Sequence, residues 1–253
     1  MTGILILARL GSSRLSNKHL LGASGKTFIE HLAGRFLKEF GKEINEEKCM
    51  LIIASSDEPA NRKFEDIFRD TPVRVFYGNR HNIPLRQFEC AGRYKLDFII
   101  SVDGDDILCS VHAARKIYEC LNTGQAPAAR TTGLPLGMNV SGYSSALLRK
   151  NLEKHPSARL ETGWGRIFSG EKFAEFRMGE YDRDRSLRFT LDYPADADFF
   201  RTLIYAAGEK IIDIPDDELI KFVKDNHFND INKSLDEEYW KNFERETREE
   251  KNG

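Results

Sequence analysis

Short apolar runs alternate with stretches of helical periodicity in the first half of the chain, and this alternation constrains the fold most. The apolar runs are Ile4–Ala8, Met50–Ser55, Val73–Tyr77 and Phe98–Val102. The stretches of helical period are Phe28–Phe40, Ala60–Phe68, Leu85–Tyr94 and Val111–Leu121. Uninterrupted apolar runs are typical of parallel strands that are buried on both faces. The alternation therefore predicts an α/β fold with a mostly parallel sheet.

The pattern weakens after about residue 128. We expect a helix at Ser144–Lys154, strands at Phe173–Met178 and Leu187–Leu191, and a helix that opens at Pro194, since proline suits the first helical turn. The chain then divides into a main α/β domain, residues 1–235, and a charged surface helix, residues 236–253.

Residues 160–187 carry many aromatic side chains outside the alternating pattern. They are Trp164, Phe168, Phe173, Phe176 and Tyr181. Aromatic residues are enriched at protein interfaces, so we predict an inserted β arm that builds a homodimer. A β-hairpin folded back on its own sheet is the alternative.

Bulk properties exclude several classes of partner. The 253 residues carry a net charge of −2, which offers no bulk attraction for nucleic acid or an anionic membrane. Apolar runs are too short for a bilayer span, and the first residues lack the features of a signal peptide. The four cysteines show no metal-ligand spacing. We expect reduced thiols in a cytoplasmic protein without nucleic-acid or membrane partners.

Two loops near the start of the chain are candidates for phosphate binding. Gly25-Lys26-Thr27 looks like the end of a P-loop, but the glycine required four residues earlier is absent. We therefore read it as a turn before the helix at Phe28, with Thr27 as the helix cap.

The loop after the first strand is the better candidate, because ligands bind at the carboxyl ends of strands in open α/β sheets. Its cations and backbone donors suit a triphosphate. The candidate residues are Ala8, Arg9, Gly11, Ser12, Ser13, Arg14 and Lys18. A solvated basic surface loop is the alternative.

Acidic residues follow two other predicted strands. "ISVDGDDIL" places Asp103, Asp105 and Asp106 after one strand, and Asp192 follows another. Such carboxylates suit a magnesium ion that bridges phosphate oxygens; an acidic turn capping the next helix is the alternative. Asp196 and Asp198 are explained by the dipole of the following helix and are left out of the site.

Several motifs occur in the order found in one enzyme family. "ARLGSSRLSNKHL", "IIASSDEPAN", "SVDGDDIL", "GMNVSGYSSALL" and "LRFTLDYPADADF" resemble motifs of the cytidylyltransferases that make CMP-activated sugars. The chain looks most like the spore coat polysaccharide biosynthesis protein F group, which is related to the CMP-KDO and CMP-sialate synthetases. The resemblance covers residues 3 to 233.

The resemblance implies a doubly wound α/β domain that is nucleotide-diphospho-sugar transferase-like and Rossmann-like, with an inserted arm. In several relatives this arm builds a dimer. It implies that Mg²⁺ is held by Asp105 and Asp192, and that these acids act in catalysis with Arg9, Arg14 and Lys18. Further residues implied in nucleotide binding are Ser55, Arg86 and Asp103, and those implied on the acceptor side are Arg130 and Asn139.

The implied activity is the transfer of CMP from CTP to a sugar acid or other small acidic acceptor, with release of pyrophosphate, in the synthesis of polysaccharide or glycan precursors. Departures from the family pattern include Ser16-Asn17 for Pro-Gly, Ile107 for proline and Asn139 for a common aspartate. The acceptor therefore stays open. A glycosyltransferase that uses Asp103-Gly-Asp105 as its DxD motif, a non-catalytic nucleotide-binding module and a structural interaction protein are the alternatives.

Overall fold

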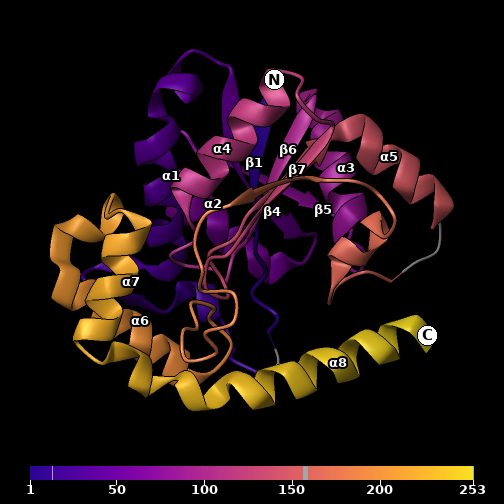
Figure 1. Ribbon diagram of the computed structural model, residues 1–253. Helices are drawn as coiled ribbons and strands as arrows, with labels where there is room; N and C mark the ends of the chain where they lie inside the picture. The colour runs from indigo at the N-terminus through magenta and orange to yellow at the C-terminus, as the bar shows by residue number, and fades with distance from the viewer. Residues whose placement is uncertain (13, 156–158, 253) are drawn as a thin grey trace.

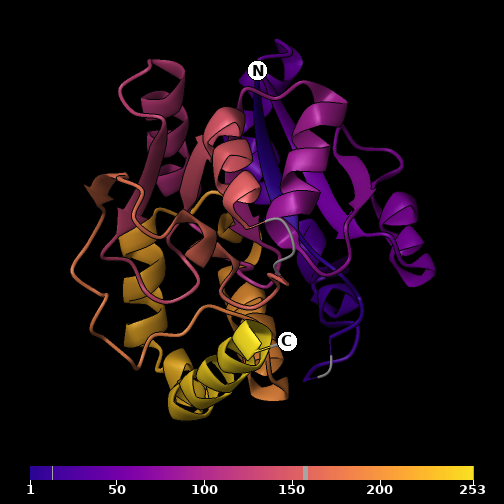
Figure 2. The same ribbon diagram turned by 90° about the vertical axis from the view of Figure 1, so that its right-hand side faces the viewer.

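A seven-stranded sheet between two layers of helices forms the centre of the computed structural model, which describes residues 1–12, 14–155 and 159–252. The strand order is β5-β4-β1-β6-β8-β7-β9. The strands are β1 (Thr2–Leu7), β4 (Cys49–Ser56), β5 (Arg74–Gly78), β6 (Phe98–Asp103), β7 (Ala128–Thr132), β8 (Ser141–Ser144) and β9 (Ala174–Arg177). Strands β5, β4, β1 and β6 run parallel, β8 is antiparallel to both its neighbours, and β9 is parallel to β7. The predicted α/β class with a mostly parallel sheet is confirmed (Figures 1 and 2).

Alternate residues of the central strands face two separate hydrophobic cores. Ile4 and Ile6 of β1 face one core, while Leu5 and Leu7 face the other. The first core is covered by α1 (Phe28–Asn45), α2 (Lys63–Phe68), α4 (Val111–Asn122), α6 (Pro194–Ala207) and α7 (Asp216–Asp225). The second is covered by α3 (Ile83–Tyr94) and α5 (Ser145–Lys154). Burial on both faces explains why these strands read as uninterrupted apolar runs.

The stretch that resembles a P-loop forms a turn before a helix, as predicted. Strands β2 (Gly22–Ala23) and β3 (Lys26–Thr27) make a small hairpin, and Gly25 at its tip has a φ of 78°, which glycine adopts without strain. Thr27 caps α1 through a reciprocal capping box with Glu30.

Residues 160–187 fold back on their own sheet, so the prediction of a protruding arm is wrong. Strand β9 pairs with β7, so it satisfies the backbone hydrogen-bonding groups of β7 and becomes the last strand of the sheet. Phe168 packs on Tyr143 with the ring centroids 4.4 Å apart, and Trp164 and Phe173 join the same core. The aromatic side chains on which the homodimer was based are therefore used within the chain, and the homodimer itself stays a prediction.

Two strands of the seven-stranded sheet were not predicted, and one predicted strand does not form. Strands β7 and β8 form an antiparallel pair that the sequence pattern did not reveal. The predicted strand Leu187–Leu191 makes only an isolated bridge, between Leu136 and Arg188. Its backbone instead ties loops together, since Leu191 N–H donates to the carbonyl of Asp105 at 2.9 Å.

The C-terminal helix α8 (Asp236–Asn252) crosses the carboxyl edge of the sheet (Figure 1). The predicted charged helix lies at the surface, and one of its faces also contacts the cavity formed by the loops that follow β1 and β6. In the described part of the chain, no helix combines the length and apolar character needed to cross a bilayer.

Candidate active site

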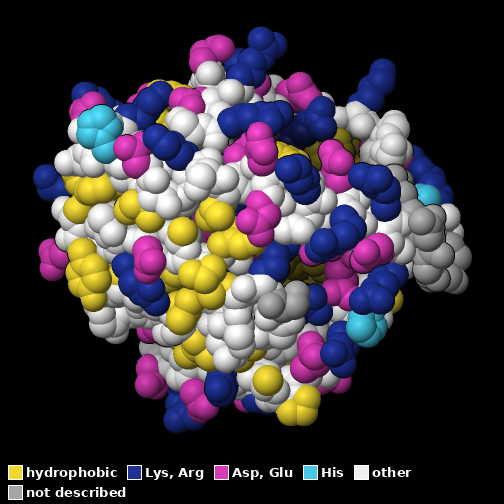
Figure 3. Space-filling view, turned by 90° about the horizontal axis from the view of Figure 1, so that it is seen from below, with side chains coloured by type: hydrophobic (Ala, Val, Ile, Leu, Met, Phe, Trp, Pro, Cys, Tyr) yellow, Lys and Arg dark blue, Asp and Glu magenta, His cyan; other side chains and the backbone are white. Residues whose placement is uncertain are grey.

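A cavity of about 840 Å³ opens at the carboxyl ends of β1 and β6, between these strands and α8. Figure 3 looks at this edge of the molecule and shows side chains of both charges crowded around a hollow. The cavity lies where ligands bind in open α/β sheets, at the position predicted from the basic loop.

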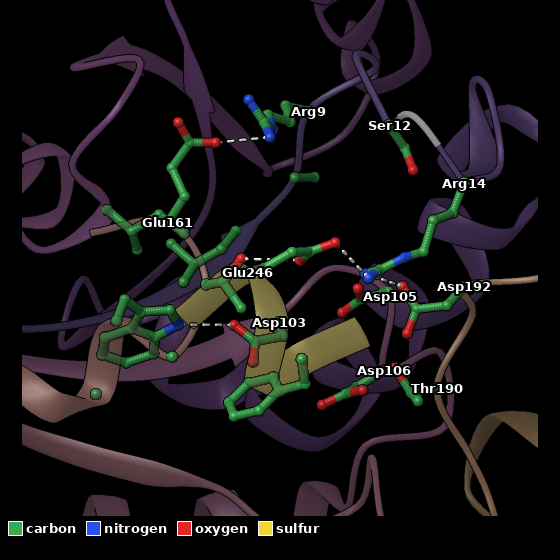
Figure 4. Close-up of a pocket in the computed structure, with 18 of the residues that line it drawn as sticks. Arg9, Ser12, Arg14, Asp103, Asp105, Asp106, Glu161, Thr190, Asp192 and Glu246 are labelled. Atoms are coloured by element: carbon green, nitrogen blue, oxygen red, sulfur yellow. Dashed lines mark hydrogen bonds and ion pairs between the residues drawn. The ribbon is translucent and has the colours of Figure 1, made fainter. Parts of the chain in front are cut away.

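The basic loop lines one side of the cavity. Ala8, Arg9, Ser12, Arg14 and Lys18 all contribute to the lining. Figure 4 shows Arg9 directed toward Glu161 on one side and Arg14 toward Asp192 and Glu246 on the other. Of the remaining predicted loop residues, Gly11 is exposed outside the lining, and Ser13 lies outside the described residues.

The Lys18 ammonium contacts both predicted metal ligands, Asp105 and Asp192. Its Nζ lies 2.7 Å from Asp105 Oδ2 and 3.0 Å from Asp192 Oδ1, and the lysine is buried. Burial alone would lower the pKa of the Lys18 ammonium, but attraction and hydrogen bonds from Asp105 and Asp192 raise it above its usual value. The ammonium therefore stays charged between two carboxylates that come from distant parts of the sequence.

The unusual Ser16-Asn17 sequence preserves the turn that brings Lys18 inward. Asn17 has a φ of 52° and a ψ of 30°, in the left-handed region. Asparagine tolerates this conformation better than other residues with a side chain, apart from aspartate. Asn17 can therefore replace a glycine here without abolishing the turn.

Gly104 allows Asp105 to approach the end of β1. Its N–H donates to the carbonyl of Leu7 at 2.9 Å, and a Cβ at this position would lie 2.6 Å from that oxygen. Any side chain here would push the acidic turn away from the basic loop. The neighbouring Ile107, which replaces a family proline, is fully buried in the core.

A buried network fixes Asp192. The Arg188 guanidinium donates to Asp192 Oδ2 at 3.2 Å and to Asp196 Oδ1 at 3.0 Å, and the Asp192 N–H donates to Asp196 Oδ2 at 2.9 Å. Asn232 donates to Asp196, and the Tyr239 ring lies 4.4 Å from the Arg188 guanidinium carbon. Asp196 is therefore more than an acid in a first helical turn, because it orients the arginine that holds Asp192.

The pKa values of the acids in the site are shifted in different directions. Burial would raise the pKa of Asp192, but Lys18, Arg14 and Arg188 lower it, so this carboxylate is ionised. Burial and the adjacent Asp105 raise the pKa of Asp103 to about 7, although Trp164 Nε1 donates to it at 3.3 Å. Burial also raises the pKa of Asp106, with Asp105 and Asp103 adding to the effect.

Most of the chain matches one family of known proteins. Residues 3–211 match the cytidylyltransferase family. The chain belongs to this family. The matched range holds the basic loop, the acidic turn and Asp192, and it ends before α7 and α8.

Relatives of this cytidylyltransferase-family chain include an uncharacterized protein of Methanocaldococcus jannaschii, 26% identical over 146 residues that span 58% of each chain. A cytidylyltransferase from Leptospira borgpetersenii has a similar structure, with a TM-score of 0.72, 24% identity, and coverage of 90% of this chain and 95% of the other. A CMP:2-keto-3-deoxy-manno-octonic acid synthetase complexed with CTP gives a TM-score of 0.59 at 17% identity, with coverage of 81% and 98%. The structural likenesses show a shared fold.

Among the other residues implied by the family resemblance, Asp103 and Arg86 line the cavity. The Arg86 guanidinium donates to the carbonyls of Ala54, Asn79 and Arg80, which fixes the loop after β5. The Ser55 hydroxyl is buried away from the lining.

The structure does not bring Arg130 or Asn139 to the cavity. Arg130 is exposed and pairs with Glu175 on the neighbouring strand. The Asn139 side chain closes its own loop by hydrogen bonds to the backbone of Leu134. Neither lies among the described residues of the lining, so other side chains must form any acceptor site there.

The contribution of α8 to the cavity was not predicted from the sequence. Tyr239, Phe243, Glu246 and Glu250 line the cavity, and their spacing places them on one face of a helix. The aromatic part of this pattern was visible in the sequence. The two glutamates were not singled out, because the tail is rich in charges that are usually solvated.

A pH dependence follows from His19, which is buried next to Lys18. Burial, with a further contribution from Lys18, lowers the pKa of His19 to about 4, and its Nδ1 lies 3.1 Å from the carbonyl of Gly104. The unfolded chain, in which histidine titrates near 6.5, binds this proton first as the pH falls. The contribution of neutral His19 to the free energy of unfolding is therefore complete above pH 6.5 and is lost between about pH 6.5 and 4.

We expect wild type to lose on the order of 3 kcal/mol more stability than His19→Asn between pH 7.5 and 4.5, since each pKa unit corresponds to 1.36 kcal/mol. Asparagine can still donate to the Gly104 carbonyl but does not titrate. Urea unfolding at the two pH values measures the difference. Equal losses of stability in both proteins would show that the titration of His19 does not cause the loss of stability at low pH.

Proposed function

We propose that the chain transfers CMP from CTP to a sugar acid or other small acidic acceptor, with release of pyrophosphate, in a Mg²⁺-dependent reaction. The observation that carries the proposal is the convergence of Arg14 and Lys18 on Asp105 and Asp192 in one cavity. Membership of the cytidylyltransferase family supports CTP as the nucleotide.

The cations of the basic loop supply most of the binding energy for the triphosphate. Arg14 is partly exposed and presents its guanidinium to the cavity, where it can pair with phosphate oxygens. Lys18 is held by two acids and offers a fixed positive charge on the same side. Arg9 lies across the cavity and can reach a different part of the nucleotide or its acceptor.

The two acids fit a magnesium ion. Mg²⁺ usually takes one or two carboxylates together with substrate phosphates and water. Asp105 and Asp192 already lie within 3.0 Å of the same ammonium nitrogen, so both can face one cation. The described residues offer no cluster of three or more metal-ligating side chains. Bound Mg²⁺ would neutralise developing charge on the phosphate oxygens.

Catalysis then rests on positioning and charge neutralisation, as in phosphoryl transfer generally. An acceptor oxygen forms a bond to the α-phosphorus while the bond from that phosphorus to the bridging oxygen of pyrophosphate breaks. Pyrophosphate carries away the electron pair, and its charge is balanced by Arg14 and Lys18. An acceptor phosphate attacks as an anion and needs no base, whereas an acceptor hydroxyl gives its proton to solvent water as the new bond forms.

The cellular setting is part of the proposal. We propose that the product is an activated precursor for a polysaccharide or glycan and that the reaction takes place in the cytoplasm, as the resemblance to the CMP-sugar synthetases implies. Homodimerisation, which occurs in several of those relatives, is a prediction that light scattering can test.

The experiment measures pyrophosphate release with Mg²⁺ from CTP, UTP, ATP and GTP, each with a panel of sugar acids and phosphorylated acids. We expect release from CTP and not from the other three nucleotides, and only when an acceptor is present. Equal rates with all four nucleotides, or no release with any, would contradict the proposal. Transfer from a nucleotide sugar would instead indicate the glycosyltransferase alternative, and CTP binding without turnover would indicate a non-catalytic module.

A further inference from the structure

Two carboxylates of α8 occupy anion-binding positions in the cavity. Glu246 pairs with Arg14 at 3.0 Å. Glu250 Oε1 accepts hydrogen bonds from the backbone N–H groups of Thr162 at 2.7 Å and Glu161 at 3.2 Å, and its Oε2 pairs with Arg166 at 2.8 Å. The two N–H groups and the Arg166 guanidinium, here called the 161–166 cradle, thus hold one carboxylate with three donors.

The 161–166 cradle is built by its own loop. The Arg166 guanidinium also donates to the carbonyls of Thr162 and Arg159, which fixes its plane without help from α8. The Glu250 side chain is only 9% exposed, so its charge sits in a defined site and not in bulk water. Charge-assisted bonds of this kind are strong for any oxyanion of suitable shape.

The present position of α8 conflicts with the ligands of the proposed reaction. Glu246, Glu249 and Glu250 all line the cavity in which a triphosphate and an acidic acceptor are to bind. Like charges in a partly buried space repel, so the helix carboxylates and the ligand anions compete for the same cations. Glu246 competes at Arg14, and Glu250 competes at the 161–166 cradle.

We propose that the 161–166 cradle is the binding site for the acidic group of the acceptor, and that Glu250 is a built-in competitor for it. This inference rests on the proposed function. The ligand class is an oxyanion on a small acceptor, either the carboxylate of a sugar acid or a phosphate. When the acceptor binds, Glu250 leaves the cradle and the C-terminal half of α8 withdraws from the cavity.

The competing explanation is that α8 never moves and Glu250 only holds it in place. The two explanations predict different directions for the change in acceptor affinity. If Glu250 only anchors α8, then Glu250→Gln and Arg166→Gln break the same contact and change acceptor binding in the same direction. If Glu250 competes with the acceptor, Glu250→Gln strengthens acceptor binding, whereas Arg166→Gln weakens it.

The experiment uses the full chain and calorimetry without CTP. The probes are an eight-carbon and a nine-carbon sugar acid, with inorganic phosphate to separate the two oxyanion sources. We expect Glu250→Gln to lower the Kd of the bound acid by about three- to tenfold, since a competitor that fills the site reduces apparent affinity by the fraction it occupies. Arg166→Gln should raise that Kd by about tenfold or more.

The matched control is Glu244→Gln. Glu244 lies on α8 but is exposed and pairs with Arg248, so the variant makes the same change of charge outside the cavity. It should bind the acid as wild type does. An unchanged or higher Kd in Glu250→Gln relative to Glu244→Gln would overturn the proposal, even if Arg166→Gln fails to fold.

The outcomes separate this inference from the proposed function. A wild-type protein that binds the acids but releases no pyrophosphate from CTP would contradict the proposed function and leave the 161–166 cradle as a binding site. A protein that makes pyrophosphate while Glu250→Gln and Glu244→Gln show the same KM for the acceptor would contradict the cradle alone.

Discussion

Asp105→Asn is expected to lower kcat for pyrophosphate release by about 10²- to 10³-fold, the loss typical of removing one preorganised electrostatic group. Asparagine keeps an oxygen for Lys18 but removes the negative charge that would bind Mg²⁺. The Asp105 side chain is 27% exposed, and the buried Lys18 ammonium keeps the carboxylate of Asp192 as a partner at 3.0 Å. Its thermal midpoint should therefore stay close to that of wild type.

Initial rates at saturating CTP across a titration of Mg²⁺ measure this effect. The matched control is Asp225→Asn, because Asp225 is exposed and pairs with Lys221 on the surface of α7. The control should keep the wild-type kcat. If Asp105→Asn reaches the wild-type kcat at saturating Mg²⁺, then Asp105 does not hold the metal.

Asp192 is a less selective probe of the same chemistry. Its carboxylate is buried and contacts Arg14, Lys18 and Arg188, so Asp192→Asn perturbs three cations at once. The structure supports a small folding cost for Asp105, whereas burial predicts a substantial one for Asp192.

The fold was predictable where sequence pattern and local environment agree. In β1, Ile4 to Leu7 are all buried because helices cover both faces, so an uninterrupted apolar run was a sufficient signal. Strands β7 and β8 escaped notice because they contain polar residues such as Arg130, Ser141 and Ser144. The segment Leu187–Leu191 alternates apolar and polar residues as a strand does, but it meets loops in place of a neighbouring strand, and its sequence cannot reveal its partners.

The site was predictable to the extent that its residues follow strand ends. Arg14, Lys18 and Asp105 lie in the loops that follow β1 and β6, and parallel topology alone brings such loops together. Glu246 reaches Arg14 from 232 positions away, in a helix beyond the family match. Only tertiary packing places that helix over the cavity, so no local pattern could assign its glutamates to the site.

Arg188→Met is expected to destabilise the protein by about 3–5 kcal/mol, the usual cost of removing one partner from a buried ion pair. Arg188 is buried and balances Asp192 and Asp196, which are also buried. Methionine fills much of the volume but leaves both carboxylates without this partner. Urea unfolding at pH 7 measures the change, and Arg201→Met is the control, because Arg201 pairs with exposed Asp198 and should cost less than about 1 kcal/mol.

The pH dependence distinguishes lost charge from lost packing in Arg188→Met. In wild type, Lys18, Arg14 and Arg188 lower the pKa of Asp192 against the effect of burial, so its contribution to stability is present above the unfolded pKa and is lost as the pH falls below it. In the variant, burial is less well compensated and the pKa of Asp192 rises. Protonation then relieves part of the cost, and the difference in unfolding free energy between wild type and variant should shrink below about pH 4. A difference that stays constant from pH 7 to pH 3.5 would mean that Arg188 stabilises the fold through packing, and that Asp192 is held by Arg14 and Lys18 alone.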